Sequence, residues 1–186
     1  MLPKLHQRII AAGGTIKFNS EPGLSDIDGI VIDCRGLAAR DTQGELRGVK
    51  GELILIETDE VELSRPVRLI HPRWPLYVIP REDNLFMLGA TSIEAEDTGV
   101  SVRSALELLG AAYAVHPAFA EARIVEFGSG LRPAFPDNLP RIAIHNQKIA
   151  VNGLYRHGFL IAPALAELTL AFVEHGQIDN EVMQCG

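Results

Sequence analysis

The sequence predicts a fold in which helices and strands are mixed, of the α/β or the α+β class, and three observations lead to this expectation. Continuous apolar runs have the composition of strands that are covered on both faces. Two apolar segments flank the polar pair Glu82-Asp83, as in a β-hairpin. Helical segments with recognisable start and stop signals alternate with the strands. The expected strands are residues 15–19, 29–36, 51–57, 76–81, 84–91, 124–130 and 148–153, and the expected helices are residues 3–12, 101–116 and 163–175.

Capping residues bound two of the expected helices. Ser101 stands where the helix at 101–116 begins, and serine side chains accept hydrogen bonds from the free N–H groups of a first helical turn. Pro163 is expected to be the first residue of the last helix, and Gly176 is expected to end it. This last segment is apolar on nearly every side, which predicts that it is buried within the protein.

The bulk composition limits the classes of function. The chain has 186 residues, of which 47% are hydrophobic and 22% are charged, so one domain with a real core is expected. A net charge of −7 without a cluster of Lys and Arg argues against binding to nucleic acid or to an anionic membrane surface. No run of 18 consecutive apolar residues occurs, so no membrane-spanning helix is expected. Cys34 and Cys185 fit a reduced, cytoplasmic protein, and the scattered histidines predict no metal site.

The segment GSGLRPAFPDNLPRI, residues 128–142, places an arginine among prolines and apolar residues. It begins like the dinucleotide-binding pattern G-x-G-x-x-G, but Pro133 occupies the last glycine position and no helix is expected to follow, so that interpretation is rejected. Two interpretations of Arg132 stay open. Either it forms a salt bridge elsewhere in the protein from a proline-stiffened loop, or its guanidinium binds the carboxylate of a ligand in a bidentate manner.

The segment VNGLYRHGFLIAP, residues 151–163, predicts a strand, a glycine-containing turn and the start of a helix. Free N–H groups and the positive end of a helix dipole point out of such a turn, where they would stabilise an anion or a polar carbonyl edge. A plain strand–turn–helix connection, with glycines for tight geometry, explains the pattern equally well. Tyr77, on the expected strand at 76–81, is either a packing residue or a hydroxyl donor to a ligand carboxylate.

Taken together, these two segments resemble the C-terminal part of the FAD-dependent D-amino-acid oxidase family, and within it the glycine oxidases of thiamine biosynthesis. Family members carry G-L-R-P-x-(T/S)-x-D-G-x-P-x-I, followed by G-x-x-R-x-G-x-x-x-A-P. Three further stretches resemble the family in the same order, namely VIDCRGLAAR, GVKGE and the LYVIPR–LFMLGAT hairpin. The resemblance implies a substrate domain with an antiparallel-rich sheet, together with the C-terminal remainder of an FAD-binding domain.

The resemblance also implies a role for each matching residue. Arg132 would bind the carboxylate of a small amino-acid substrate, and Tyr77 would donate a second hydrogen bond to it. Arg156 would lie near both the flavin and the substrate. Gly36 would approach the adenosine region of FAD, and the turn before the last helix would face the pyrimidine edge of the flavin. The residues of that turn are Gly153, Arg156, His157 and Gly158.

The chain departs from the family pattern at three matching positions and in one whole unit. Phe135 replaces a small hydroxyl residue, Asn138 replaces a glycine, and Ser92 stands where the hairpin of glycine oxidases can carry a methionine. These differences leave the identity of the substrate open. The family's N-terminal G-x-G-x-x-G unit is not in this sequence, so about half of the FAD-binding domain is expected to be missing.

From the resemblance we expect three parts in the chain. Residues 1–45 would be a remnant of the FAD-binding domain, residues 46–125 the substrate domain, and residues 126–186 the return into the FAD-binding domain. A truncated reading frame, an intentionally shortened chain and one half of a split enzyme each explain the missing unit. In the last case the partner would be the N-terminal half of a flavoenzyme.

The expected reaction is the oxidative deamination of a small amino acid, by hydride transfer to flavin. Because half of the flavin site is expected to be missing, we expect no activity from this chain by itself. Two alternatives stay open. One is a catalytically inactive remnant that associates into a homo-oligomer through the surfaces that the lost half once covered. The other is a small-carboxylate binding module that uses Arg132 without redox chemistry.

Overall fold

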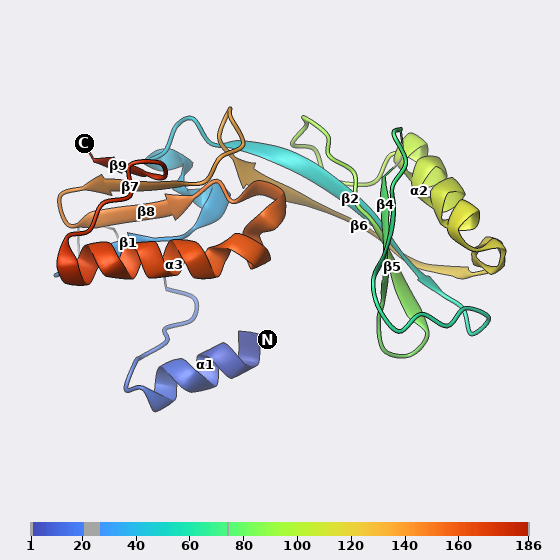
Figure 1. Ribbon diagram of the computed structural model, residues 1–186, viewed down its shortest axis with the longest axis horizontal. Coiled ribbons are helices and arrows are strands. Elements are labelled where there is room, and N and C mark those ends of the chain that lie inside the picture. The colour runs from blue at the N-terminus through green and yellow to red at the C-terminus, as the bar shows by residue number, and fades with distance from the viewer. Residues whose placement is uncertain (1, 21–26, 74, 186) are drawn as a thin grey trace. The chain divides into compact units, whose positions relative to one another are not determined.

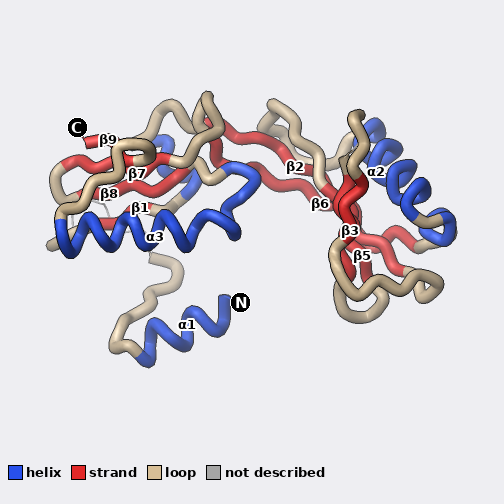
Figure 2. The backbone as a smooth tube through the Cα atoms, viewed as in Figure 1, coloured by secondary structure: helices blue, strands red, loops and turns tan. Residues whose placement is uncertain are grey.

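The structure, a computed structural model, describes residues 2–20, 27–73 and 75–185 (Figures 1 and 2). The chain divides into two units, Met1–Val31 and Ile32–Gly186, and each is described by itself. The second unit holds two β-sheets, which Figure 2 shows in red, and a helix lies against each of them. This mixture of sheets and separate helices confirms the predicted mixed fold, and its class is α+β. The predicted division at residues 45/46 and 125/126 stays a prediction.

The first unit contains helix α1 (Leu2–Ala11) and the loop that follows it. Gly13 has a positive φ of 86° and the N–H of Gly14 donates to the carbonyl of Ile9, so the helix ends at the glycine pair as predicted. The strand expected at residues 15–19 is wrong. These residues form a loop, because no described segment pairs with them and Asn19 adopts a left-handed φ of 53°.

The larger sheet of the second unit is antiparallel, with strand order β3-β4-β5-β2-β6. The predicted hairpin is confirmed as β4 and β5, in which Tyr77 pairs with Gly89. Strand β2 pairs with β6 along its length, with a register shift between Leu55 and Ile56. The strands are β2 (Arg47–Glu57), β3 (Val67–Leu69), β4 (Leu76–Pro80), β5 (Leu85–Gly89) and β6 (Arg123–Ala134).

Helix α2 (Val102–Val115) covers one face of this sheet (Figure 1). Ser101 is its N-cap, as predicted, and its side chain accepts a hydrogen bond of 3.1 Å from the N–H of Ser104. The short helix η2 (Pro117–Ala120) follows and adds Phe119 to the same core. Between α2 and the sheet, the buried apolar side chains include Ile54, Ile56, Leu76, Val78, Phe86, Leu88 and Leu108.

Strand β6 extends further than the sequence predicts. Arg132 and Pro133 lie on this strand, opposite Val49 and Gly48, so the stiff loop expected at Arg132 is wrong. A proline is tolerated here because β6 is the edge strand of its sheet, where one side of the backbone needs no partner. Arg132 is therefore held by a strand pairing rather than by a rigid turn.

The smaller sheet has the order β1-β8-β7-β9, and helix α3 lies along one of its faces (Figure 1). Strand β7 is antiparallel to β8 and parallel to β9. The predicted strands at 29–36 and 148–153 are confirmed with shorter bounds, whereas β7 and β9 were not among the expected strands. The elements are β1 (Val31–Asp33), β7 (Arg141–His145), β8 (Lys148–Asn152), β9 (Met183–Cys185), η1 (Gly36–Asp41) and η3 (Tyr155–His157).

Helix α3 (Gly158–His175) differs from its prediction in two ways. It begins five residues before Pro163, which lies inside the helix, while the predicted end at Gly176 is confirmed by a left-handed φ of 66°. The predicted burial is wrong, because only Leu165 and Thr169 are buried. The apolar residues of α3 that do not face the smaller sheet have no covering layer in the described residues of the second unit.

The exposed apolar character of α3 also bears on the membrane expectation. By length and composition alone, the segment Tyr155–His175 is apolar enough to cross a membrane, although it holds no run of 18 consecutive apolar residues. The expectation that no helix spans a membrane stays a prediction. Helices that pack on a sheet within a domain pass the same test. The buried Leu165 packs with Ile142 and Ile149 of the smaller sheet, so one side of α3 serves as a domain helix.

Candidate functional site

The face of the larger sheet that lies opposite α2 is poor in side chains. Residues that pair directly across antiparallel strands point to the same side, and Leu53 pairs with Gly89 and with Gly128. Gly51 lies two residues before Leu53 and so belongs to the same face. Tyr77, which pairs with Gly89, points to this face as well. Three glycines on neighbouring strands leave room above the sheet for larger side chains or for a ligand.

Arg132 occupies part of this room. Its guanidinium lies over Gly51, where a Cβ atom would overlap it, and its Nη1 donates a hydrogen bond of 3.0 Å to the carbonyl oxygen of Thr91. Among the described residues, no carboxylate lies within ion-pair distance of Arg132. The interpretation of Arg132 as half of an internal salt bridge is therefore wrong for the described part of the chain.

The electrostatic surroundings of Arg132 favour an added anion. Burial and the neighbouring positive charge of Arg156 lower the pKa of the Arg132 guanidinium, while Tyr155 acts in the opposite direction. Arginine nevertheless stays protonated in proteins, because its ordinary pKa lies far above neutral pH. Among the described residues this half-buried cation lies beside a second cation and has a carbonyl oxygen as its one acceptor, which makes it a favourable place for a ligand carboxylate.

The turn before α3 brings Arg156 to the same place. Tyr155 has a left-handed φ of 50°, and its hydroxyl lies 2.6 Å from the hydroxyl of Ser92, which follows the end of β5. This contact joins η3 to the end of the hairpin, and the exposed side chain of Arg156 lies next to it in the chain. The structure thus brings Arg156 close enough for its charge to act on Arg132.

Tyr77 shares the glycine-lined face but has a different contact. The guanidinium of Arg68 stacks over its ring, with 5.3 Å between the guanidinium carbon and the ring centroid. No hydrogen bond joins Tyr77 to Arg132 among the described residues. Its position on the face agrees with a ligand-facing hydroxyl, and its role stays a prediction.

Sequence reasoning missed two residues that hold this arrangement, Thr91 and Tyr155. Thr91 provides the carbonyl that accepts from Arg132, and its hydroxyl accepts a 2.9 Å hydrogen bond from the N–H of Glu52. Both residues stand beside positions that were singled out, Ser92 and Arg156. The roles of Thr91 and Tyr155 depend on which distant segments of the chain come into contact, and a local sequence pattern does not predict such contacts.

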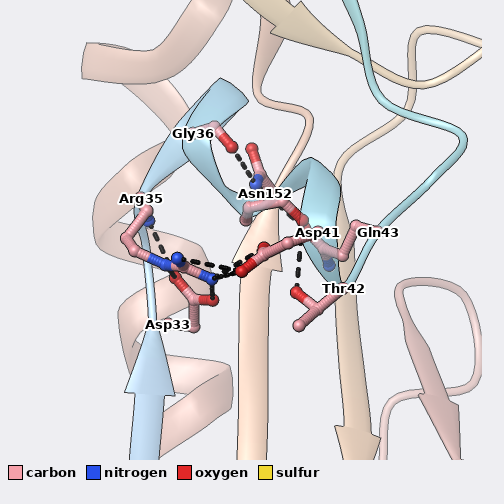
Figure 3. A network of polar contacts seen from close by, with 8 residues as sticks. Asp33, Arg35, Gly36, Asp41, Thr42, Gln43 and Asn152 are labelled. Carbon is pink, nitrogen blue, oxygen red and sulfur yellow. Dashed lines mark hydrogen bonds and ion pairs between the residues drawn. The ribbon is translucent and has the colours of Figure 1, made fainter. Parts of the chain in front are cut away.

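A polar network fixes the segment after β1, where Gly36 is found (Figure 3). Asp33, at the end of β1, is buried and accepts hydrogen bonds from the Nε and Nη2 of Arg35 at 2.9 and 2.8 Å. The same guanidinium reaches Asp41 at 3.0 Å. The hydrogen bond from Arg35 lowers the pKa of Asp33 and outweighs its burial. The chain is thereby turned into η1 at a defined place.

Asn152 links this segment to the end of β8. Its side-chain nitrogen donates to the carbonyl of Gly36 and to the side-chain oxygen of Gln43, both at 2.9 Å, as Figure 3 shows. Its oxygen accepts from the N–H of Gly153. Gly36 itself has a positive φ of 62°, and its carbonyl is held by the buried amide of Asn152. Two of the predicted cofactor-contacting glycines are therefore positioned by one asparagine.

Gly153 has a packing reason to be glycine. It has a φ of 77°, and a Cβ at this position would overlap the ring of Phe135. Phe135 is buried, and the guanidinium of Arg141 stacks on its ring. Asn138, which replaces a glycine of the family pattern, has a left-handed φ of 60°, a conformation that asparagine tolerates. The fold thus accommodates Phe135 and Asn138, the two residues that differ from the family pattern here. The role of Gly153 in binding a cofactor stays a prediction.

An apolar groove of about 660 Å³ runs between α3, β1 and β8. Gly158 opens α3 at one end of this groove, where the unpaired N–H groups of the first turn carry the positive end of the helix dipole. His157 precedes it and is exposed. The lining comes mostly from apolar atoms, and its members include Ile32, Gly36, Pro133, Val151, Tyr155, Gly158, Ala162 and Leu170.

The sequence matches the family described as FAD dependent oxidoreductase over residues 2–171. The chain belongs to this family. Gly36, Arg132, Arg156 and the Gly153–Gly158 turn all lie in the matched part of the chain. FAD is accordingly the cofactor that the family uses, and oxidoreduction is its chemistry.

Two relatives and one solved structure describe the likeness further. The chain is 58% identical over 146 residues to the thiamine biosynthesis oxidoreductase ThiO of Rhizobium etli, which covers 77% of this chain and 45% of that protein. It is 30% identical to the glycine oxidase of Geobacillus kaustophilus, over 68% of this chain and 34% of that protein. The crystal structure of glycine oxidase from the same organism superposes with a TM-score of 0.64 at 27% identity, over 76% of this chain and 40% of that chain. The chain thus spans less than half the length of each of these three proteins.

The described residues fit one side of a bound flavin. The groove beside α3 offers apolar walls to an aromatic ring system, and the first turn of α3 offers N–H donors to a polar edge. The left-handed Gly36 lines the same groove without a side chain that would fill it. Among the described residues, no three His, Cys, Asp or Glu side chains gather in a way that would hold a metal ion.

Proposed function

We propose that this chain carries the substrate-binding part of an amine oxidase that deaminates a small amino acid with FAD as hydride acceptor. One observation supports this most strongly. Arg132 is half-buried over Gly51, lies beside Arg156, and has no carboxylate partner among the described residues. Buried or half-buried cations normally have an anionic partner, so a substrate carboxylate is the natural one here.

The proposed roles follow from positions on the glycine-lined face. Arg132 binds the substrate carboxylate in a bidentate manner, and Tyr77 donates a second hydrogen bond from the same face. Arg156 adds positive charge on the side of η3. Together these groups orient the substrate so that its Cα–H points away from the sheet. Holding the substrate in this orientation lowers the entropic part of the reaction barrier. The flavin, when bound, supplies the redox chemistry by accepting the hydride.

We propose that Gly36, Gly153, Arg156, His157 and Gly158 contact FAD from the side of this chain. Gly36 and Gly158 line the groove beside α3, whereas Gly153 and His157 adjoin it in the same turn. The N–H groups at the start of α3 would stabilise negative charge on reduced flavin. The remaining contacts, including those to the pyrophosphate, would come from a nucleotide-binding half that covers α3.

The exposed side of α3 supports such a covering half. Leu170 is 54% exposed and Phe159 81% exposed, although both belong to a helix that is apolar on nearly every side. Strand β1 is the edge of its sheet, and no strand among the described residues pairs with its outer side, which can pair with a further strand. The R. etli relative is more than twice as long as the part matched here. The partner proposed for this surface is therefore the N-terminal, nucleotide-binding half of a flavoenzyme, working in the cytoplasm, where the free and exposed Cys34 stays reduced.

The exposed side of α3 also supports a second candidate function. An uncovered apolar helix also promotes self-association, and a homo-oligomer of an inactive remnant would bury Leu170 against a second copy. A third candidate function is a carboxylate-binding module without redox chemistry. It is supported only by the guanidinium of Arg132, which has no carboxylate partner among the described residues. The three functions differ in what they require of α3 and of FAD, and one set of measurements separates them.

The test combines this chain with the part of the R. etli relative that it does not match, together with FAD. We expect the mixture to show a flavin absorption spectrum that neither component shows by itself, and to release hydrogen peroxide with glycine. Leu170→Lys, on the exposed side of α3, should abolish assembly. Leu106→Lys, a matched change on the exposed side of α2, should leave assembly intact.

Other results would favour the other functions. A stable dimer of the chain in light scattering at micromolar concentration, lost in Leu170→Lys and indifferent to the added half, supports the self-associating remnant. Heat of binding with glycine that disappears in Arg132→Gln, without flavin binding in any mixture, supports the carboxylate module. An assembled, flavin-containing mixture in which Arg132→Gln oxidises glycine as well as the natural chain would overturn the proposed role of Arg132.

A further inference from the structure

A second cavity, of about 290 Å³, lies between the end of β5 and helix α2. Three arginines line it, from the loop before β4, from the first turn of α2 and from η3, whereas Glu107 is the only acidic residue among the described residues of its wall. The floor is apolar, with Leu108 and Ala111 of α2. The arginines are Arg73, Arg103 and Arg156. The wall thus carries an excess of two positive charges over a short apolar floor.

Two of the three arginines on this wall, Arg103 and Arg156, are not neutralised by the residues that the structure describes. Arg103 and Arg156 have no carboxylate within ion-pair distance among those residues, and Glu107 is not paired with Arg103, although it lies four residues later on α2. Both arginine side chains are exposed. Two unpaired guanidinium groups that share a concave surface attract an anion more strongly than either does by itself.

The cavity adjoins the place proposed for the substrate carboxylate. Thr91 lines the cavity, and its carbonyl oxygen accepts the hydrogen bond from Arg132. Arg156 also lines the cavity, and its charge lowers the pKa of Arg132. A ligand with one carboxylate on Arg132 therefore has a positively charged cavity beside it. Its volume corresponds to roughly ten water molecules at about 30 Å³ each, enough for a short acidic side chain.

We infer that this cavity is a second anion subsite, and that the amine substrate is an amino acid with a second carboxylate. The first carboxylate binds to Arg132, the second binds to Arg103 and Arg156, and the methylene groups between them lie on the floor at Leu108. This inference rests on the proposed function, because it assumes that the substrate carboxylate lies on Arg132. It goes beyond that function in naming acidic amino acids over glycine as the substrate class.

The test compares alanine with aspartate and glutamate, which add a carboxylate to the same amino-acid frame. Calorimetric titrations of the full chain at low ionic strength, with both enantiomers of each, should show at least about tenfold tighter binding of one acidic amino acid than of alanine. In Arg103→Gln, that ratio should fall to within about threefold. Arg65→Gln is the matched control, because Arg65 does not line the cavity, and it should keep the full ratio.

Three results would overturn the subsite. These are equal affinities for alanine and the acidic amino acids, a ratio that Arg103→Gln does not change, and no binding of aspartate or glutamate at millimolar concentrations. The assembled enzyme separates this failure from failure of the proposed function. Flavin reduction with alanine and aspartate at equal efficiency would leave the function standing without the subsite. Binding of aspartate that depends on Arg103, without flavin reduction in the assembled mixture, would leave the subsite standing without the function.

Discussion

The two sheets of the second unit bury their apolar residues to different degrees. In the larger sheet, Ile54, Val78 and Leu88 are fully buried under α2, which has its exposed residues on the other side. In the smaller sheet, only two residues of the 18-residue helix α3 are buried. The larger sheet and α2 form a complete two-layer core, whereas the smaller sheet and α3 form two layers of an arrangement that calls for a third.

The helices themselves account for this difference. The sequence of α2 combines small and large apolar residues with charged ones. Packing of one side of this helix against the larger sheet is therefore enough to bury most of its apolar surface. The sequence of α3 is apolar around nearly its whole circumference. An exposed leucine or phenylalanine gains about 1.5–3 kcal/mol when it is fully covered. Each uncovered residue of α3 is thus a source of affinity for the proposed nucleotide-binding half.

The largest expected effect lies in the larger sheet, at a buried ion pair. Lys50 Nζ lies 2.9 Å from Oε1 of Glu52 and 2.7 Å from Oδ2 of Asp97, and Glu52 is fully buried. Lys50→Met would leave the Glu52 carboxylate without its cation, and we expect a loss of about 3–5 kcal/mol in the free energy of unfolding, measured with urea at neutral pH. The double variant Lys50→Met/Glu52→Gln, which removes both charges, should recover much of the loss. A double variant as unstable as the single one would show that the ion pair is not the cause.

The same pair gives a pH prediction with a defined sign. Burial raises the pKa of Glu52, but hydrogen bonds from Ser104 and Lys50 outweigh it, so the net pKa lies below the ordinary value of 4.5. A carboxyl with a depressed folded pKa contributes stability above its unfolded pKa and loses it as the pH falls. In Lys50→Met, the hydrogen bond from Lys50 that lowers the pKa of Glu52 is lost while the burial that raises it remains, so the pKa of Glu52 in the folded variant rises. The stability gap between the natural chain and the variant should therefore shrink between pH 7 and pH 4, and a gap that widens would contradict this account.

The next effect compares the covered and uncovered sides directly. Ile54→Ala, in the core under α2, should lower the free energy of unfolding by about 2–5 kcal/mol. Leu170→Ala, on the uncovered side of α3, should change it by less than about 0.5 kcal/mol in the chain by itself. Adding the nucleotide-binding half should make Leu170→Ala costly while leaving the Ile54 effect unchanged. A large effect of Leu170→Ala in the isolated chain would mean that α3 is already covered, for instance by a second copy.

The comparison also shows what the sequence can predict. Local features were predicted well: the serine N-cap of α2, the hairpin of β4 and β5, and the left-handed glycine after α3 all depend on neighbouring residues. The burial of α3 was predicted wrongly, because an apolar surface shows that a helix needs a cover and does not show whether the cover is in the same chain. The strand expected at 15–19 failed for a similar reason, since a strand needs a partner that its own sequence does not specify.

The candidate site was predicted in part. Arg132 and Arg156 were identified from motifs, and the structure places Arg156 close enough for its charge to act on Arg132. The support of Arg132 by the carbonyl of Thr91 could not be predicted, because any residue has a carbonyl and only the pairing of β2 with β5 and β6 places this one. The interpretation of the arginine loop as rigid was wrong because Arg132 and Pro133 lie on an edge strand, and the turn with Pro136 begins only after that strand ends.

A smaller effect is expected at the glycines of the uncovered region. Gly153→Ala combines a positive φ with overlap between the new Cβ and Phe135, and should lower the free energy of unfolding by about 2–3 kcal/mol. Gly36→Ala has a similar φ but only an ordinary contact of 3.8 Å with Pro133, so about 1 kcal/mol is expected. Urea titrations of the two variants measure the difference. Equal losses would mean that φ alone decides the cost, and that the ring of Phe135 moves aside.

Gly51→Ala is expected to have the smallest effect on stability and a large effect on ligand binding at the site. Gly51→Ala places a Cβ where the guanidinium of Arg132 lies, and the end of a flexible side chain can move away at little cost. We expect the free energy of unfolding to change by less than about 1 kcal/mol. Displacement of Arg132 should nevertheless weaken the binding of a carboxylate ligand by about tenfold or more, because one bidentate charge-assisted contact is lost.

The matched control is Gly130→Ala, which pairs with Gly51 across β2 and β6 but has open space around its Cβ position. It should leave both stability and ligand binding nearly unchanged, as measured by urea unfolding and by titration with glycine. Equal binding by both alanine variants would show that the ligand carboxylate does not lie on Arg132 above Gly51. The glycine-lined face would then be a packing feature of the larger sheet, complete in itself like the core under α2, and the substrate site would have to be sought on the uncovered side with α3.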